Sequence, residues 1–218
     1  MKVGVLGTGS VGKTVGAKLV ELGHEVMMGS RSASNPVCAA WAEEHGERAR
    51  HGTFTDAAAF GEVVVNATAG TGSLEALRQA GADNLSGKLL VDIANALDFS
   101  RGMPPSLAVV NTDSVGERIQ REFPEARVVK TLNTVTAAVM VDPGRLAGSH
   151  SMFMAGNDGE AKAQARTLLR ELGWPDEAVI DLGGIESARG MEMYLPLWLS
   201  LMGALGTPNF NILVQREG

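Results

Sequence analysis

The sequence is poor in the residues that make covalent or metal cross-links. Its 218 residues include one cysteine, Cys38, and four histidines. A single cysteine has no partner for a disulfide within the chain, and the histidines are not clustered at metal-ligand spacing. The composition therefore favours neither a disulfide scaffold nor a metal site, and we expect Cys38 to be a small filler on a helix.

An excess of positive charge and a long apolar run are also missing. The formal net charge is −6 at pH 7, whereas nucleic-acid-binding proteins usually carry a basic patch. The most apolar stretch, Met191 to Leu205, contains Glu192 and Pro196 and is shorter than the ~20 residues that span a bilayer. We expect no nucleic-acid or membrane partner. Because the chain enters a strand-like pattern at once, without a signal peptide, we also expect a cytoplasmic protein.

Short β-rich runs alternate with helical patterns, which predicts an α/β fold with a Rossmann-type, doubly wound and mainly parallel sheet. In the first unit, Val11, Val15 and Leu19 recur at helical spacing, and Gly23 stands where a helix C-cap belongs. Strands are expected at Lys2–Leu6, Glu25–Gly29, weakly near His51–Phe54, and at Val63–Ala67, Lys88–Ile93 and Arg127–Leu132. Helices are expected at Pro36–His45, from Thr55 onward, and within Glu75–Ala80 and Ser114–Phe123.

Turn formers interrupt this pattern at Asp98–Pro105, which we expect to be a loop, and again at Asp142–Ser149. After the second break the sequence predicts a small α/β extension that ends in an apolar helix. Its expected elements are strands at Ser151–Ala155 and Ala178–Leu182, a helix at Gly159–Leu172, and the apolar helix at Met191–Leu205. We therefore predict a nucleotide-binding domain at 1–148 and an extension at 149–218.

A glycine-rich loop follows the first strand. Its residues, in the order of the dinucleotide-binding fingerprint, are Gly7, Thr8, Gly9, Ser10, Val11 and Gly12. Glycines in this pattern permit a tight turn and bring the pyrophosphate close to the N-terminus of a helix. With Lys13 and Thr14 the same string also matches a phosphate-binding P-loop, and Asp92 could then serve as the magnesium-binding acid. Gly9 favours the dinucleotide interpretation, because a P-loop does not require glycine there.

The end of the second strand indicates which dinucleotide is bound. The strand is followed by Ser30, Arg31 and Ser32, where NAD-specific folds commonly carry the acid that binds the ribose hydroxyls. A guanidinium flanked by hydroxyls is suited to a 2′-phosphate instead. We therefore predict NADP(H), with Asn35 as a weaker candidate that could equally cap the next helix.

The later strand ends carry small or amide side chains and no charge. Ligands in open α/β sheets bind beyond the carboxyl ends of the strands. We therefore assign Ala67, Thr68, Ala69, Ala94 and Asn95 to the cofactor site, and Asn133, Thr134 and Val135 to the substrate site.

A conventional proton donor is not evident. Tyr194 is the only tyrosine and has no lysine four residues beyond it, and the final lysine and histidine are Lys162 and His150. We assign no catalytic residue and no metal ligand. Hydride exchange with a flavin or deazaflavin would relax the need for a donor, because the ring delocalises the charge it receives.

Four motifs resemble the NADPH-dependent coenzyme F420 reductases and their bacterial relatives. They are Gly7–Gly12, Gly29–Ser32, Leu132–Val135, and Ser187-Ala188-Arg189 before Glu192 and Pro196. The cytosolic domains of the six-transmembrane ferric reductases are similar but more distant. The resemblance implies a homodimer formed through the C-terminal portion. It also implies a deazaflavin beside Leu132–Val135, although the family carries histidine where this chain has Asn133.

These observations predict hydride transfer between NADPH and a deazaflavin (F420) or flavin. Two alternatives stay open at this point. One is a small-substrate carbonyl or imine reductase, and the other is a protein that binds NADP(H) without turnover.

Overall fold

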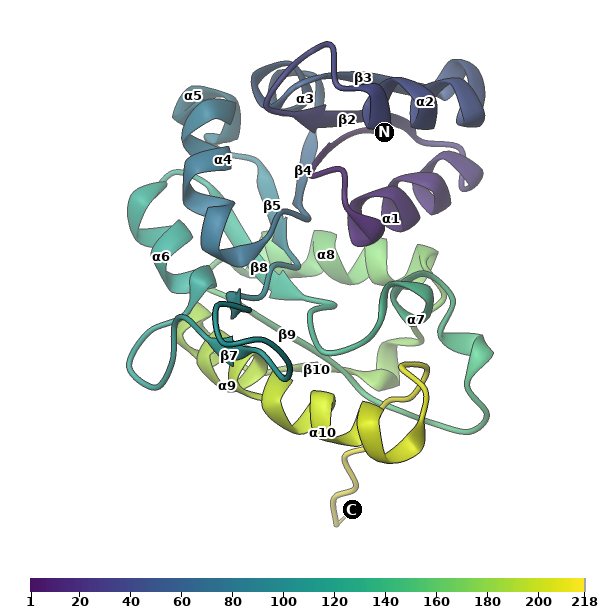
Figure 1. The fold of residues 1–218 in the computed structure, drawn as a ribbon, viewed down its shortest axis with the longest axis vertical. Helices are drawn as coiled ribbons and strands as arrows, with labels where there is room; N and C mark the ends of the chain where they lie inside the picture. Colours follow the sequence, from purple (N-terminus) through teal and green to yellow (C-terminus); the bar gives the residue numbers. More distant parts are fainter. Residues whose placement is uncertain (218) are drawn as a thin grey trace.

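The computed structural model describes residues 1–217, and these build one eight-stranded sheet with helices on both faces (Figure 1). The strands are β1 (Lys2–Leu6), β2 (Glu25–Ser30), β3 (Ala49–Thr53), β4 (Val63–Asn66), β5 (Leu89–Asp92), β8 (Arg127–Thr131), β9 (Met152–Gly156) and β10 (Val179–Asp181). Their order is β10-β9-β8-β5-β4-β1-β2-β3. The pairs from β3 to β8 are parallel, β9 runs antiparallel to β8, and β10 is parallel to β9. The predicted Rossmann-type, mainly parallel fold is confirmed.

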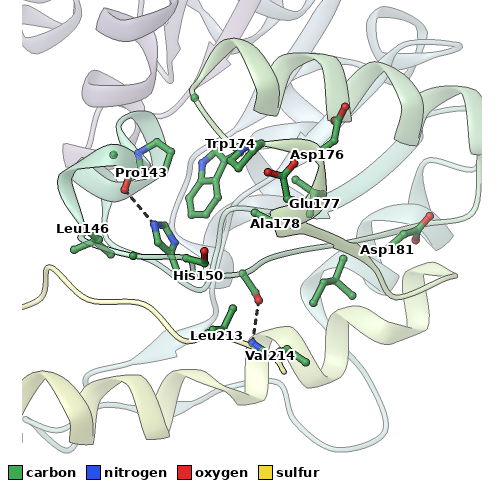
Figure 2. Close-up of a pocket in the computed structure, with 18 of the residues that line it drawn as sticks. Pro143, Leu146, His150, Trp174, Asp176, Glu177, Ala178, Asp181, Leu213 and Val214 are labelled. Carbon is green, nitrogen blue, oxygen red and sulfur yellow. Dashed lines mark hydrogen bonds between the residues drawn. The ribbon is translucent and has the colours of Figure 1, made fainter. Parts of the chain in front are cut away.

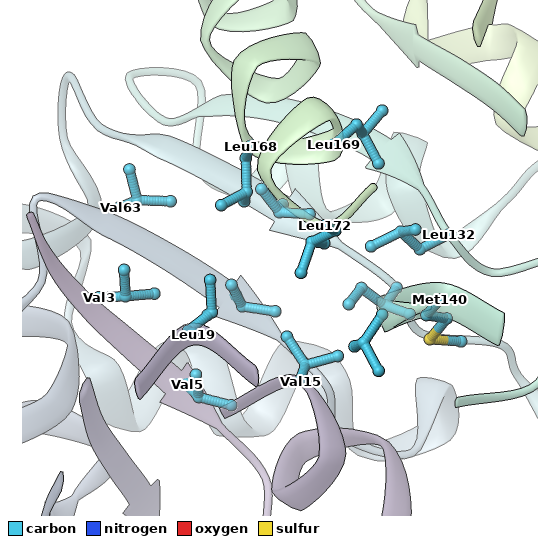
Figure 3. Packing of buried hydrophobic residues seen from close by; sticks show 14 of the residues in the cluster. Val3, Val5, Val15, Leu19, Val63, Leu132, Met140, Leu168, Leu169 and Leu172 are labelled. Atoms are coloured by element: carbon cyan, nitrogen blue, oxygen red, sulfur yellow. The ribbon is translucent and has the colours of Figure 1, made fainter. Parts of the chain in front are cut away.

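Two apolar layers separate the sheet from its helices. Because side chains alternate across a strand, Val63 and Val65 of β4 belong to one layer and Val64 to the other. The first layer, drawn in Figure 3, is covered by α1 (Ser10–Glu21), α2 (Pro36–His45), α7 (Ala137–Val141) and α8 (Gly159–Glu171). The second is covered by α3 (Phe54–Phe60), α4 (Ser73–Ala80), α5 (Ala82–Leu85), α6 (Val115–Glu122) and α9 (Ala188–Met193).

Local sequence signals explain several helix starts. Asn35 accepts hydrogen bonds from the amides of Val37 and Cys38, and Pro36 occupies the first turn of α2. Thr53 and Asp56 form a capping box, so α3 begins at Phe54. The predicted third strand was therefore placed too late: it covers Ala49–Thr53, and the capping box ends it before Phe54.

The region expected to be a loop at Asp98–Pro105 is bracketed by a two-residue antiparallel pair, β6 (Leu97–Asp98) and β7 (Ser106–Leu107). Single 3-10 turns occur at η1 (Gly46–Arg48), η2 (Gly70–Gly72), η3 (Pro143–Arg145), η4 (Asp176–Ala178) and η5 (Ile185–Ser187). Strands β9 and β10 extend the same sheet as the first 148 residues. The division of the chain at residue 148 stays a prediction.

The apolar C-terminal segment is two helices rather than the single one expected. Helix α9 ends at Met193 and α10 runs over Leu195–Leu205, with Tyr194 between them. The break has a simple cause: Pro196 has no N–H to donate to the carbonyl of Glu192, so it is tolerated only in the first turn of a new helix. Within residues 1–217, no helix combines the length and apolar character needed to cross a membrane.

Candidate functional site

The glycine loop joins β1 to α1 at the carboxyl edge of the sheet. Gly7 has φ +118°, and a β-carbon there would overlap the carbonyl oxygen of Ala67 on the next strand end. A β-carbon at Gly12 would overlap the carbonyl of Gly7. Gly9 differs, because its hypothetical β-carbon meets no atom within 4 Å. Two glycines therefore allow close packing, whereas Gly9 faces open space.

A cavity of about 420 Å³ lies beside this loop. It is lined by Gly7, Thr8, Gly9, Ser30, Arg31, Asn35, Phe54, Ala67, Thr68, Ala69, Gly72, Glu75, Ala76 and Gln79. The Ser30 hydroxyl donates to the Ser32 carbonyl at 2.7 Å and shapes the turn after β2. Arg31 is exposed, and no salt bridge among the described residues involves it. The guanidinium is therefore available to an anion in this cavity.

The position of Asp92 argues against the P-loop alternative. Asp92 is fully buried, 2.9 Å from Lys130 Nζ, and accepts a hydrogen bond from Asn66 Nδ2 at 2.8 Å. A carboxylate committed in this way is not available to bind magnesium beside the glycine loop.

A second cavity, of about 310 Å³, adjoins the first at Ala67 and Thr68, which line both. Its other lining residues are Ser10, Val11, Ile93, Ala94, Asn95, Leu97, Asn133, Val135, Thr136, Ala137, Met140, Leu195 and Trp198. The two cavities form one track that passes the start of α1 and the ends of β1, β2, β4, β5 and β8.

Asn133 is held rigidly at the end of β8. Its side chain is 2% exposed, and Nδ2 donates to Asn95 Oδ1 at 3.0 Å and to the carbonyl of Met191 at 3.1 Å. The preceding residue, Leu132, is buried with φ +63°, a left-handed conformation that is strained for a leucine. Such strain persists only where the surrounding structure enforces it, and here it places the Asn133 amide in the second cavity.

A buried charge network lies behind this cavity. Lys130 Nζ is 2.9 Å from Asp92 and 2.8 Å from Glu192, and it also donates to the carbonyl of Ala94. Burial opposes the charged form, but the two carboxylates outweigh it and raise the pKa of Lys130 above its ordinary value. Lys130 is therefore charged, and it links the turn at Ala94 and Asn95 to α9.

The C-terminal motif docks α9 against α6. Glu192 accepts hydrogen bonds from the amides of Val115 and Gly116, which are free N–H groups at the start of α6. Arg189 Nε donates to Glu117 at 2.8 Å, and this bond holds the pKa of the Glu117 carboxyl below its ordinary value. The resemblance motif at Ser187–Glu192 therefore includes residues that build the scaffold.

Most of the residues predicted from the sequence line one of the two cavities. The exceptions are Gly12, which packs against Gly7, Ser32, which contacts Ser34 within its own loop, and Thr134, which is buried without lining either cavity. The sequence patterns did not indicate Phe54, Glu75 and Gln79 in the first cavity or Leu195 and Trp198 in the second. Glu75 and Gln79 share one helix face at i, i+4 spacing, and this spacing in the sequence indicates that the two polar side chains lie side by side.

A third cavity, of about 740 Å³, is larger than either of these and shares no lining residue with this track (Figure 2). Several of its polar groups are already paired. His150 Nε2 contacts the Pro143 carbonyl (Figure 2), Asp176 pairs with Arg170, and Asp181 pairs with Lys162. The glycine loop and Arg31 line the first cavity and not this one.

Comparisons with known proteins agree with this geometry. Residues 2–96 match the model of a family described as coenzyme F420-dependent NADP oxidoreductase. The crystal structure of a candidate F420-dependent NADP reductase from Arthrobacter sp. FB24 is 57% identical, with a TM-score of 0.93, over 99% of this chain and 100% of that one. The chain belongs to the F420-dependent NADP oxidoreductase family.

Other relatives are more distant. The F420-dependent NADP reductase of Methanothermobacter marburgensis is 29% identical over 92% of each chain. Metalloreductase STEAP3 of Rattus norvegicus is 28% identical over 90% of this chain, which spans only 38% of the length of that protein. An imine reductase from Aspergillus terreus is 21% identical with a TM-score of 0.64 over 94% of this chain and 62% of its own. At that identity the likeness concerns the fold alone.

Proposed function

We propose that this protein transfers a hydride between NADPH and the deazaflavin coenzyme F420. The observation that carries the proposal is the pair of adjoining cavities, one beside the glycine loop and one at the strand ends, which meet at Ala67 and Thr68. An extended dinucleotide on this track would place its adenosine half near Arg31 and its nicotinamide near Asn95. The second ring would lie against Asn133 and Val135.

Two features support the binding of NADP(H) in the first cavity. Gly9 has open space where a β-carbon would stand, as the fingerprint requires for close approach of the pyrophosphate. The exposed guanidinium of Arg31 suits the 2′-phosphate of NADP. Ser30 would then act by shaping the turn, since its hydroxyl is bonded to Ser32.

The residues that line the second cavity support a deazaflavin as the hydride acceptor. Among its lining residues there is no acid, lysine or histidine. These residues therefore offer no conventional proton donor to a substrate that must receive a proton along with the hydride. A deazaflavin delocalises the charge that arrives with the hydride. The protein then has to align two rings and exclude water, which Ile93, Met140 and Leu195 are suited to do. A flavin acceptor would use the same features and stays a prediction.

We also infer that the chain works as a homodimer that pairs through α10. Leu195 is the buried residue of this helix, whereas Leu197 and Leu205 are 57% and 56% exposed. Apolar surface of this kind on a helix suits a subunit interface. A cytoplasmic location, as expected from the sequence, would give access to NADPH.

The proposal is tested by mixing the purified protein with NADPH and oxidised F420 and following the absorbance of both. We expect F420 to be reduced with NADPH and much more slowly with NADH. The same assay with a flavin and with a panel of carbonyls and imines covers the alternatives. Oxidation of NADPH by an imine without F420 reduction would favour the reductase alternative, and tight NADPH binding without any oxidation would favour a binding protein.

A further inference from the structure

Four buried side-chain polar atoms lack a hydrogen-bond partner among the residues that the structure describes. They are Asn133 Oδ1, Thr134 Oγ1, Tyr194 OH and Trp198 Nε1. Buried polar groups are almost always paired, so an unpaired one calls for a reason. Two of the four, Asn133 and Trp198, line the same cavity, although they are 65 residues apart in sequence. Thr134 and Tyr194 do not line it.

The orientation of the Asn133 amide is fixed by its neighbours. Both hydrogens of Nδ2 are used, one by Asn95 Oδ1 and one by the Met191 carbonyl. The Asn95 amide is fixed in turn, because its Nδ2 donates to the backbone carbonyl of Asn133 at 2.9 Å. Turning the Asn133 amide over would set its oxygen against two acceptors. Asn133 therefore presents an oxygen that can only accept a hydrogen bond.

Trp198 provides the complementary group. An indole N–H can only donate, and this one has no acceptor. The ring is stacked on Phe210, with centroids 5.4 Å apart and planes 24° apart. It follows Leu195, the buried residue of α10, by three positions on the same helix face. Packing thus fixes the indole, and its N–H is left without a partner.

We propose that Trp198 Nε1 and Asn133 Oδ1 together recognise an amide-type edge, a carbonyl beside an N–H, on the ligand of the second cavity. Trp198 is then a specificity-determining residue of this site, an inference that rests on the proposed hydride transfer. Both reactants carry such an edge, the nicotinamide as a carboxamide and the deazaflavin in its pyrimidinedione ring. A simple ketone or imine lacks the N–H and leaves Asn133 Oδ1 unpaired.

The test is Trp198→Phe, which removes the N–H and keeps an aromatic ring on Phe210. Since the N–H is unpaired in the free protein, the variant loses no protein hydrogen bond, and its Tm should fall only by the packing lost with the smaller ring. The matched control is Trp174→Phe, in which the indole donates to the carbonyl of Met140 at 2.9 Å. That variant loses a satisfied bond and should melt earlier than the parent. An equal fall in Tm for the two variants would show that Trp198 has only a structural role and would overturn the proposal.

Two calorimetric titrations identify the edge that is recognised. NADP⁺ is titrated into each protein alone, and a 5-deazaflavin with a free N3–H is titrated in the presence of saturating NADP⁺. Loss of one neutral hydrogen bond should weaken the recognised ligand about 2- to 12-fold in Trp198→Phe and leave the Trp174→Phe control near the parent. Weaker NADP⁺ binding assigns the edge to the nicotinamide, and weaker deazaflavin binding assigns it to the pyrimidinedione.

Ligand analogues provide a readout that does not depend on a variant. The 3-acetylpyridine analogue of NADP⁺ and an N3-methyl deazaflavin both keep a carbonyl but lack the N–H. The analogue of the recognised ligand should bind the parent about 2- to 12-fold more weakly than the natural form. Unchanged Kd values in every titration would overturn the proposal. Because binding needs no turnover, a change in Kd without hydride transfer would disprove the proposed function and leave this inference intact.

Discussion

Three glycines of the loop between β1 and α1 have different physical tasks. Gly7 and Gly12 let backbone segments approach closely, since a β-carbon at either would overlap a carbonyl oxygen. Gly9 has φ −73° and ψ 179°, an extended conformation that any residue adopts, and no protein atom near its hypothetical β-carbon. Its requirement for glycine therefore comes from the ligand rather than from the fold.

This difference yields a prediction. Gly9→Val should leave the circular dichroism spectrum and Tm near those of the parent, while NADPH affinity falls by at least about tenfold, or about 1.4 kcal/mol. The control, Gly12→Ala, should instead lower the stability by about 1–3 kcal/mol through overpacking against Gly7. Unchanged NADPH affinity in Gly9→Val, measured by calorimetry, would argue against a dinucleotide at this loop.

Arg31 is the residue that should distinguish the two nicotinamide cofactors. Truncation to alanine removes a hydrogen bond between charged groups that contributes roughly 1.5–3 kcal/mol, so NADPH affinity should fall about 10- to 150-fold. NADH affinity should barely change. Added salt should weaken NADPH binding to the parent more than to Arg31→Ala, because the lost interaction is electrostatic and Arg31 is exposed. Equal weakening of both cofactors would mean that Arg31 supports the loop.

At the scale of elements, one buried cation ties together four parts of the fold. Lys130 of β8 joins Asp92 of β5 to Glu192 of α9, and Glu192 also caps α6. The pKa of Lys130 is raised despite its burial. The same ammonium group holds the Ala94 carbonyl, next to the Asn95 that orients Asn133. A stable scaffold and the geometry of the second cavity thus depend on one side chain.

Replacing Lys130 by methionine keeps much of the volume and leaves two buried carboxylates without their cation. Breaking a buried pair in this way typically costs about 3–5 kcal/mol, so Lys130→Met should show a clearly lower urea midpoint than the parent. The double variant Lys130→Met/Asp92→Asn should recover part of this loss, because Glu192 keeps the two amides at the start of α6. Without such recovery, lost packing rather than uncompensated charge would explain the defect.

The sequence predicted several elements at their observed bounds because helices and strands have local causes. Period-2 and helical patterns located Lys2–Leu6 and Pro36–His45 at their observed bounds. Parallel topology then brought Ala67, Asn95 and Asn133 to one edge. The charge network was not predicted, since no local pattern indicates that Lys130 and Glu192 meet. Trp198 was missed for the same reason: only the tertiary placement of α10 brings its ring to the cavity.

At the scale of the whole molecule, α10 has two faces with different surroundings. One face brings Leu195 and Trp198 to the second cavity. The other exposes Leu197, while Leu213 and Val214, in the chain that follows the helix, are each 48% exposed. A second copy that covered this apolar surface would also hold the cavity wall in place. Assembly and acceptor binding should therefore be coupled.

Leu197→Glu tests this coupling, because it puts a charge on the exposed face of α10 without touching a residue that lines the cavity. We expect the parent to have about twice the chain mass of 22.8 kDa by light scattering and the variant to approach the chain mass itself. An isolated charge buried at an interface costs several kcal/mol, so dissociation should extend into the micromolar range. Acceptor KM should rise in the variant, while the contribution of the adenosine half to NADPH affinity is kept, because the first cavity is built from other elements.

The matched control is Leu22→Glu, the same substitution at a leucine that is 38% exposed at the end of α1. It should alter neither mass nor kinetics. A parent that is already monomeric would remove the homodimer from the proposed function and leave hydride transfer untouched. A dimeric Leu197→Glu would place the interface on another surface, and a dissociated variant with an unchanged acceptor KM would show that α10 holds its position without a partner.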